Sequence, residues 1–159
     1  MILIGIDPGS RQCGYGIIEV KNYKIVAAGS GIIKIKPTLN FEDKLYFLSV
    51  ELKKIIEQYK PDFASVESIF YGKNMRVAFT LGHFRGVIVY CLREQNIPVY
   101  SYAPREIKHS VTGRGNASKA QIEYTVQSML KLSSPAKEDA ADGLAAAICL
   151  YNKEKFNLK

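Results

Sequence analysis

The chain opens with an apolar run that ends on an acid and is followed at once by a turn. Ile2 to Ile6 form an unbroken apolar stretch, which is typical of a strand covered on both faces. Pro8 and Gly9 fit a tight turn, since proline fixes φ and glycine accepts a positive φ. Asp7 therefore lies where the strand leaves the core. Asp7 is either a plain turn residue or a carboxylate aimed into a cleft. Further acids at the same edge of the sheet would favour the second interpretation.

The next stretch of the chain predicts two more strands, over 14–20 and 24–36, from glycine-flanked and alternating apolar positions. Short connections between these strands indicate an antiparallel meander. Apolar residues at three- and four-residue spacing then predict an amphipathic helix over 41–59, with Asn40 as its N-cap. The short apolar segment 63–67 reads as a strand that arrives from this helix, so it runs parallel to the first strand.

A second helix is predicted over 74–94, and it is apolar on almost every side. A helix without a clear polar face is buried in a large core or in a subunit contact. A chain of this size cannot cover such a helix fully, which favours a homodimer. Gly82 and Gly86, four residues apart, would let a partner helix approach closely. The central core helix of a monomer remains an alternative.

The remaining sequence predicts one more strand and three helices. These are a strand over 97–102, a short helix from Pro104, a loop over 111–116, a helix over 117–132 and a last helix from Pro135 to about Tyr151. The expected architecture is an α/β domain over 1–152, with a five-stranded mixed sheet flanked by helices and a charged tail over 153–159. The three antiparallel strands come first, and the parallel strands follow.

Composition narrows the class of protein. A chain of 159 residues with 47% apolar residues fits one globular domain. No segment approaches the ~20 apolar residues that span a bilayer, and no signal peptide is evident. Three scattered cysteines and two distant histidines argue against a zinc site or a disulfide framework, and they fit a cytoplasmic location. The net charge of +7 suggests an anionic partner, most often nucleic acid.

Three further acids join Asp7 in a pattern that favours a metal site. Glu67 ends its strand as Asp7 ends the first, and neighbouring strands lie ~4.8 Å apart. Asp139 and Asp142 are three residues apart on the last helix, so they share a face with Cβ atoms ~5–6 Å apart. Carboxylates this close oppose one another's ionisation unless a cation lies between them.

Such an all-oxygen set suits magnesium or manganese. Two ions ~3.5–4 Å apart could clamp both the attacking and the leaving oxygens of a phosphodiester. On a basic protein this chemistry indicates a nuclease or a strand-transfer enzyme.

The sequence resembles the RuvC family of Holliday-junction resolvases over nearly its whole length. The blocks that carry the resemblance are Gly5-Ile6-Asp7-Pro8-Gly9-Ser10, Gly14-Tyr15-Gly16, Val66-Glu67-Ser68-Ile69-Phe70, Leu81-Gly82-His83-Phe84-Arg85-Gly86, Tyr102-Ala103-Pro104-Arg105-Glu106-Ile107-Lys108, Gly113-Arg114-Gly115-Asn116-Ala117-Ser118-Lys119 and Asp139-Ala140-Ala141-Asp142. The resemblance implies a ribonuclease H-like fold and a homodimer that places paired symmetric nicks in four-way DNA junctions during recombination and repair. It also implies two Mg²⁺ ions per site, with Mn²⁺ as a substitute, and cooperation with the RuvA–RuvB branch-migration complex.

The resemblance also assigns roles to single residues. The catalytic, metal-binding acids are Asp7, Glu67, Asp139 and Asp142, and the expected DNA contacts are Phe70, Lys108, Lys119, Arg76, Arg105 and Arg114. Phe70 would stack on junction bases, although a core phenylalanine just past the strand is an equal alternative. Whether Asp142 binds metal directly or orients the attacking water stays open. Relatives usually carry alanine at position 143, so Gly143 is expected to weaken the helix by ~1 kcal/mol and to loosen Asp142.

Two other classes share parts of this pattern. Sugar kinases and actin-like ATPases also open with a Gly-Ile-Asp-x-Gly strand and turn, but this chain is too short for their two lobes. A ribonuclease H-like nucleic-acid binder with lost or redirected catalysis is the other alternative. The presence of all four acids argues against lost catalysis.

Overall fold

The structure is a computed structural model that describes residues 1–69, 74–136, 138–155 and 157, with Glu138 described by its backbone alone. Its strands are β1 (Ile2–Asp7), β2 (Gln12–Lys21), β3 (Lys24–Lys34), β4 (Phe63–Glu67) and β5 (Val99–Tyr102). Its helices are α1 (Phe41–Tyr59), α2 (Met75–Glu94), α3 (Pro104–Thr112), α4 (Lys119–Leu130) and α5 (Glu138–Glu154).

The strands form one five-stranded mixed sheet in the order β3-β2-β1-β4-β5. β1 pairs antiparallel with β2, and β2 pairs antiparallel with β3. β4 lies parallel to both β1 and β5. The predicted sheet is therefore confirmed, and the parallel pairing of β1 with β4 brings the carboxyl ends of these two strands to the same edge.

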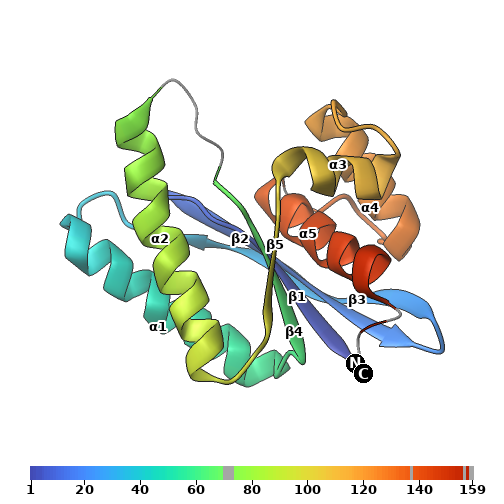
Figure 1. The fold of residues 1–159 in the computed structure, drawn as a ribbon, viewed down its shortest axis with the longest axis horizontal. Coiled ribbons are helices and arrows are strands. Elements are labelled where there is room, and N and C mark those ends of the chain that lie inside the picture. Colours follow the sequence, from blue (N-terminus) through green and yellow to red (C-terminus); the bar gives the residue numbers. More distant parts are fainter. Residues whose placement is uncertain (70–73, 137, 156, 158–159) are drawn as a thin grey trace.

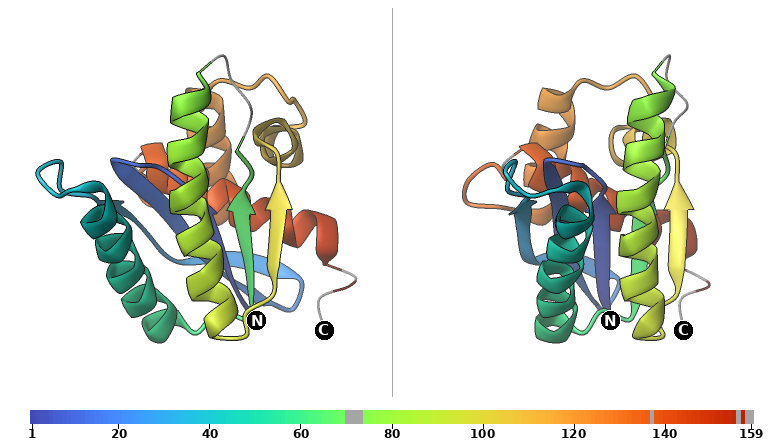
Figure 2. Two further views of the ribbon diagram at one scale, coloured as in Figure 1. Left: turned by 60° about the vertical axis from the view of Figure 1, so that its left-hand side comes forward. Right: turned by 90° about the vertical axis from the view of Figure 1, so that its left-hand side faces the viewer.

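Helices cover both faces of the sheet (Figures 1 and 2). α1 and α2 lie on one face, while α3, α4 and α5 lie on the other. Successive side chains of a strand point to opposite faces. Accordingly, Leu3 of β1 joins the core under α5, and Ile4 and Ile6 join the core under α1 and α2. None of the described helices has the length and apolar character needed to cross a membrane.

Local signals account for several helix ends. The Asn40 side chain accepts a hydrogen bond of 2.7 Å from the backbone N–H of Asp43, which confirms the predicted N-cap of α1. Ser118 caps α4 and exchanges hydrogen bonds with Gln121 in a capping box. α4 therefore starts at Lys119 rather than at the predicted residue 117.

Other predicted boundaries were wrong by a few residues. β2 starts at Gln12 rather than at residue 14, and β5 starts at Val99 because the N–H of Ile97 bonds to Leu92 at the end of α2. The expected loop over 111–116 begins two residues late, since α3 continues through Thr112. α5 starts at Glu138 rather than at Pro135 and continues to Glu154, so the first two residues of the predicted tail are helical.

Candidate metal and nucleic-acid site

Two of the predicted acids stand at the ends of adjacent parallel strands. Asp7 is the last residue of β1, and Glu67 is the last residue of β4. The register aligns Ile6 with Val66. Asp7 and Glu67 are the next residues in their strands, so they lie side by side at the same level of the sheet. Both side chains are only partly exposed. The prediction that these carboxylates share one edge is confirmed.

The helix acids reach the same place from the other side. Asp139 and Asp142 lie in the first turns of α5, and the chain brings them against the end of β1. Carboxylate oxygens of Asp7, Asp139 and Asp142 lie within 4.8 Å of one another. Glu67 lies outside this close group, but its carboxyl interacts electrostatically with both Asp7 and Asp142. Residues far apart in the sequence thus form one acidic centre.

Burial and mutual repulsion hold protons on the strand acids. Burial, followed by the charges of Asp142 and Asp139, raises the pKa of Asp7 to about 7. Burial, followed by the charges of Asp7 and Asp142, raises the pKa of Glu67 to about 8. Full ionisation of this centre near neutral pH therefore requires a compensating positive charge. An all-oxygen donor set of this kind fits a hard divalent cation.

Two of the predicted DNA-contacting lysines border the acids. The charge of Lys119, the first residue of α4, offsets part of the rise in the pKa of both Asp7 and Glu67, and that of Lys108 in α3 offsets part of the rise for Glu67. Both lysines must therefore lie within electrostatic reach of the acidic centre. They supply positive charge around a site that otherwise repels the phosphates of a nucleic acid.

The other predicted DNA contacts lie elsewhere or outside the described residues. Arg76 is exposed in the first turn of α2. Arg114 is exposed between α3 and α4, where its backbone N–H donates to the Thr112 hydroxyl. Arg105 lines a cavity of about 650 Å³ between α3 and the end of α5. Phe70 lies outside the described residues. The structure therefore places these three arginines outside the close acid group.

Arg85 is a residue of the site that the sequence interpretation missed. Its Nε donates to the backbone carbonyl of Glu67 at 3.3 Å, and its Nη2 donates to the hydroxyl of Ser101 at 2.6 Å. The side chain thus ties α2 to the ends of β4 and β5, beside one of the acids. An arginine inside a predominantly apolar helix was the available signal, but its partners come from distant segments.

Gly143 has a packing role that the sequence did not indicate. This glycine packs against the backbone of β2, and an added Cβ would lie 2.5 Å from the carbonyl carbon of Tyr15. The missing side chain lets α5 approach the sheet closely. The expected loosening of Asp142 stays a prediction.

Comparisons with known proteins agree with this geometry. The family model described as "Crossover junction endodeoxyribonuclease RuvC" matches residues 3–150. A protein of that name from Petrotoga mobilis is 41% identical over 153 residues, covering 96% of this chain and 94% of its own. Another of that name, from Proteus mirabilis, is 43% identical over 155 residues, covering 96% and 88%.

Solved structures share the fold. The Thermus thermophilus RuvC structure matches with a TM-score of 0.88 at 23% identity, covering 99% of this chain and 98% of its own. The yeast mitochondrial Holliday junction resolvase Ydc2 matches with a TM-score of 0.69 at 14% identity, covering 96% and 80%. The predicted ribonuclease H-like fold is confirmed.

Proposed function

This chain belongs to the RuvC family of crossover junction endodeoxyribonucleases, and on that premise we propose how its own residues resolve a four-way DNA junction. Holliday-junction resolution is the activity of the chain, and its roles in recombination and repair follow from the family. We infer that the domain over 1–152 introduces paired symmetric nicks by metal-assisted hydrolysis of phosphodiester bonds.

One observation carries the proposed mechanism: the carboxylate oxygens of Asp7, Asp139 and Asp142 lie within 4.8 Å of one another. Asp7 would hold the metal together with the helix acids, and Glu67 would complete the set from β4. Two Mg²⁺ ions, which Mn²⁺ can replace, would activate water and neutralise charge on the scissile phosphate. The raised pKa values of Asp7 and Glu67 mean that both acids lose their protons most readily when cations bind.

The residues around the acids would hold the DNA. Lys108 and Lys119 lie close enough to the acids to contact the phosphates that flank the cut. Arg76, Arg105 and Arg114 are proposed contacts to the junction arms, and Phe70 is proposed to stack on junction bases. These contacts predict that junction affinity falls steeply as salt rises and that Lys119→Ala reduces the salt slope by ~1.

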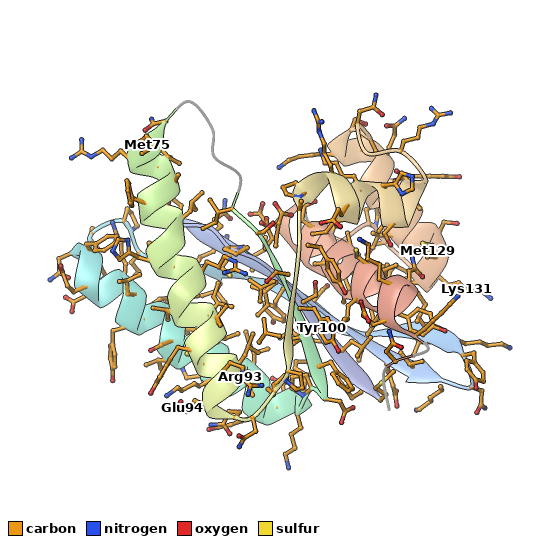
Figure 3. The ribbon with its side chains drawn as sticks, viewed as in Figure 1. Met75, Arg93, Glu94, Tyr100, Met129 and Lys131 are labelled. Atoms are coloured by element: carbon orange, nitrogen blue, oxygen red, sulfur yellow. The ribbon has the colours of Figure 1, made fainter. Side chains whose placement is uncertain are left out.

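We also propose that the protein acts as a homodimer through α2. Met75 and Phe79 lie one turn apart on the same side of this helix and are 60% and 65% exposed, and Figure 3 shows Met75 near the first turn of α2. Residues from this region line a cavity of about 420 Å³; they are Ile69, Met75, Ala78, Phe79, Gly82 and His83. Contiguous exposed apolar surface of this kind marks an interaction site. Arg85 links this helix to the strand end that carries Glu67.

Sedimentation of a surface variant tests the dimer. Phe79→Asp places a charge in the apolar face and should yield a monomer. The matched control is Tyr124→Asp on α4, which is 74% exposed on the opposite face of the molecule and should leave the assembly unchanged. Equal dimer content in both variants would remove α2 from the interface.

The family resemblance supports two further proposals. The RuvA–RuvB branch-migration complex is the proposed partner at the junction. The cytoplasm is the proposed location, which agrees with an activity on DNA and with cysteines that are all buried free thiols (Cys13, Cys91 and Cys149).

Cleavage of a substrate panel tests the function. A mobile four-way junction, a linear duplex of the same sequence and an RNA–DNA hybrid are incubated with enzyme in Mg²⁺, in Mn²⁺ and in chelator. We expect paired nicks at symmetric positions in the junction, with either metal and not in chelator. Cleavage of the hybrid or duplex at the same rate as the junction would contradict the proposal.

A further inference from the structure

The pairing between β1 and β4 stops one residue short of the two strand acids. Its register ends with Ile6 opposite Val66, although the strands continue to Asp7 and Glu67. In a parallel ladder, the carbonyl of Glu67 would accept the next hydrogen bond from the N–H of residue 8. Residue 8 is a proline, which has no N–H to donate. The turn after β1 therefore removes the strand donor for the main-chain oxygen of Glu67.

The side chain of Arg85 supplies a donor to this oxygen from another element. Its Nε donates to the carbonyl of Glu67 at 3.3 Å, and its Nη2 donates to the hydroxyl of Ser101 on β5 at 2.6 Å. Arg85 is half-buried on α2, which runs beside β4 and β5 (Figure 2). Because the guanidinium group is planar and rigid, its two hydrogen bonds fix the carbonyl of Glu67 relative to β5.

The sheet holds the same main chain from its other side. Glu67 pairs with Tyr102 in the register of β4 and β5, and the N–H of Ser68 donates to the carbonyl of Tyr102 at 2.9 Å. The main chain of Glu67 is thus held by β5 and by Arg85. Its carboxylate interacts electrostatically with Asp7 of the acidic centre.

We propose that Arg85 is a positioning residue of the metal site, which holds the main chain of Glu67 so that its carboxylate can share a cation with the other acids. Glu67 lies outside the close group of Asp7, Asp139 and Asp142, so the placement of its main chain determines how well its side chain reaches that cation. Mg²⁺ demands near-ideal octahedral geometry. Groups that hydrogen-bond around metal ligands typically contribute about tenfold to a hundredfold to metal affinity.

The inference rests on the proposed metal-dependent function, and its test measures metal binding without DNA. Mn²⁺ affinity is measured by electron paramagnetic resonance on the full chain. Arg85→Met removes both hydrogen bonds and keeps the apolar stem of the side chain. Thermal unfolding of each variant establishes that all samples are folded at the temperature of the measurement.

The matched control is Arg93→Met on the same helix. Arg93 also donates to a main-chain carbonyl, that of Ile97 at 3.2 Å. Ile97 precedes the start of β5, so this contact lies at the opposite edge of the sheet from the acids. The control variant therefore loses an arginine and its main-chain hydrogen bond without touching Glu67.

We expect Arg85→Met to weaken Mn²⁺ binding by about tenfold and Arg93→Met to leave it unchanged. The direction is informative, because the loss of a nearby positive charge would by itself favour the binding of a cation. Wild-type or tighter affinity in folded Arg85→Met would overturn the inference while leaving the proposed function intact, and so would equal weakening in both variants. Wild-type binding no tighter than that of Asp7→Asn would instead overturn the proposed function and the inference with it.

Ser101→Ala tests the same link if Arg85→Met does not fold. Ser101 is exposed, so the loss of its hydroxyl should cost little stability, but it removes the acceptor that holds the guanidinium group on β5. Weakened Mn²⁺ binding in Ser101→Ala supports the inference. In that case, wild-type affinity in Ser101→Ala would overturn it.

Discussion

Helices α5 and α2 lie on opposite faces of the same sheet and use glycine in opposite ways. In α5, Gly143 touches the backbone of β2, and no side chain could be added there without moving the helix. In α2, a Cβ at Gly82 or Gly86 would meet nothing within 4 Å. Gly143 thus serves a contact within the chain, whereas Gly82 and Gly86 leave space that the proposed partner could fill.

The side chains of the two helices follow the same division. α5 buries a run of small residues, among them Ala140, Ala141 and Ala147, beside larger ones such as Leu144 and Ile148. α2 buries mainly large residues, Phe84, Ile88 and Leu92. Close backbone contact leaves little freedom for α5, and the helix acids of the site lie on this tightly seated element. The helix acids of the site thus lie on the closely packed α5, whereas the proposed dimer surface lies on α2.

The largest expected difference between the two faces is catalytic. Glu67→Gln removes a carboxylate from the acidic centre and should lower the single-turnover nicking rate by about a thousandfold, or ~4 kcal/mol of barrier. Glu94→Gln is the control on the other face. Glu94 bridges Lys53 at 2.6 Å between α2 and α1, and its loss should leave nicking unchanged. Equal rates for Glu67→Gln and the wild type would remove Glu67 from the site.

Two core substitutions, one that shrinks a side chain in α2 and one that enlarges a side chain in α5, test how tightly each helix packs. Truncating Phe84 to alanine in α2 should cost about 3–5 kcal/mol in the free energy of unfolding, because it leaves a cavity. Enlarging Ala147 to valine in α5 should cost about 1–3 kcal/mol, because that helix has no room for extra methyl groups. Urea titrations of both variants measure these values. A stabilising effect of Ala147→Val would contradict the tight seating of α5.

The pH dependence of stability should have opposite signs on the two faces. Without metal, the folded chain keeps protons on Asp7 and Glu67 up to pH about 7 and about 8, whereas the unfolded chain releases them near 3.8 and 4.5. Their contribution to stability is therefore present below pH 4 and is lost as pH rises towards 8, by a few kcal/mol. Hydrogen bonding to Lys53 lowers the pKa of Glu94, so its smaller contribution is lost as pH falls through that lowered value.

Unfolding curves between pH 4 and 8 measure this effect, with and without Mg²⁺. Asp7→Asn should flatten the metal-free profile, because one of the two proton-holding acids is gone. Added Mg²⁺ should raise stability most at the upper end of the range, where it binds the ionised acids. A metal-free profile that rises steadily over this range would contradict the raised pKa values.

Sequence patterns predicted the elements that carry the site but not how closely they pack. The apolar run before Asp7 and the spacing of Asp139 and Asp142 are local signals, and the structure confirms what they indicate. The chain reverses between β1 and β2 as predicted, but the expected positive φ at Gly9 was wrong, since among the described glycines only Gly113 has a positive φ. Helix and strand ends shifted because distant or capping hydrogen bonds decide them, as at Ile97.

Two residues whose packing the sequence did not indicate depend on tertiary contacts. Gly143 looks unfavourable by helix propensity alone, and only the backbone of β2 beneath it explains its presence. Arg85 looks like an isolated charge on an apolar helix until β4 and β5 supply its hydrogen-bond acceptors. Neither partner is visible in the sequence near these residues.

Nicking and binding of a mobile four-way junction by Asp7→Asn, measured on the same samples in Mg²⁺, test the central claim most directly. The carboxylate of Asp7 joins the strand acids to the helix acids. The account predicts that this variant loses nicking while its junction affinity stays within about twofold of the wild type, since the lysines that bind phosphate are unchanged. Nicking at the wild-type rate would contradict the account.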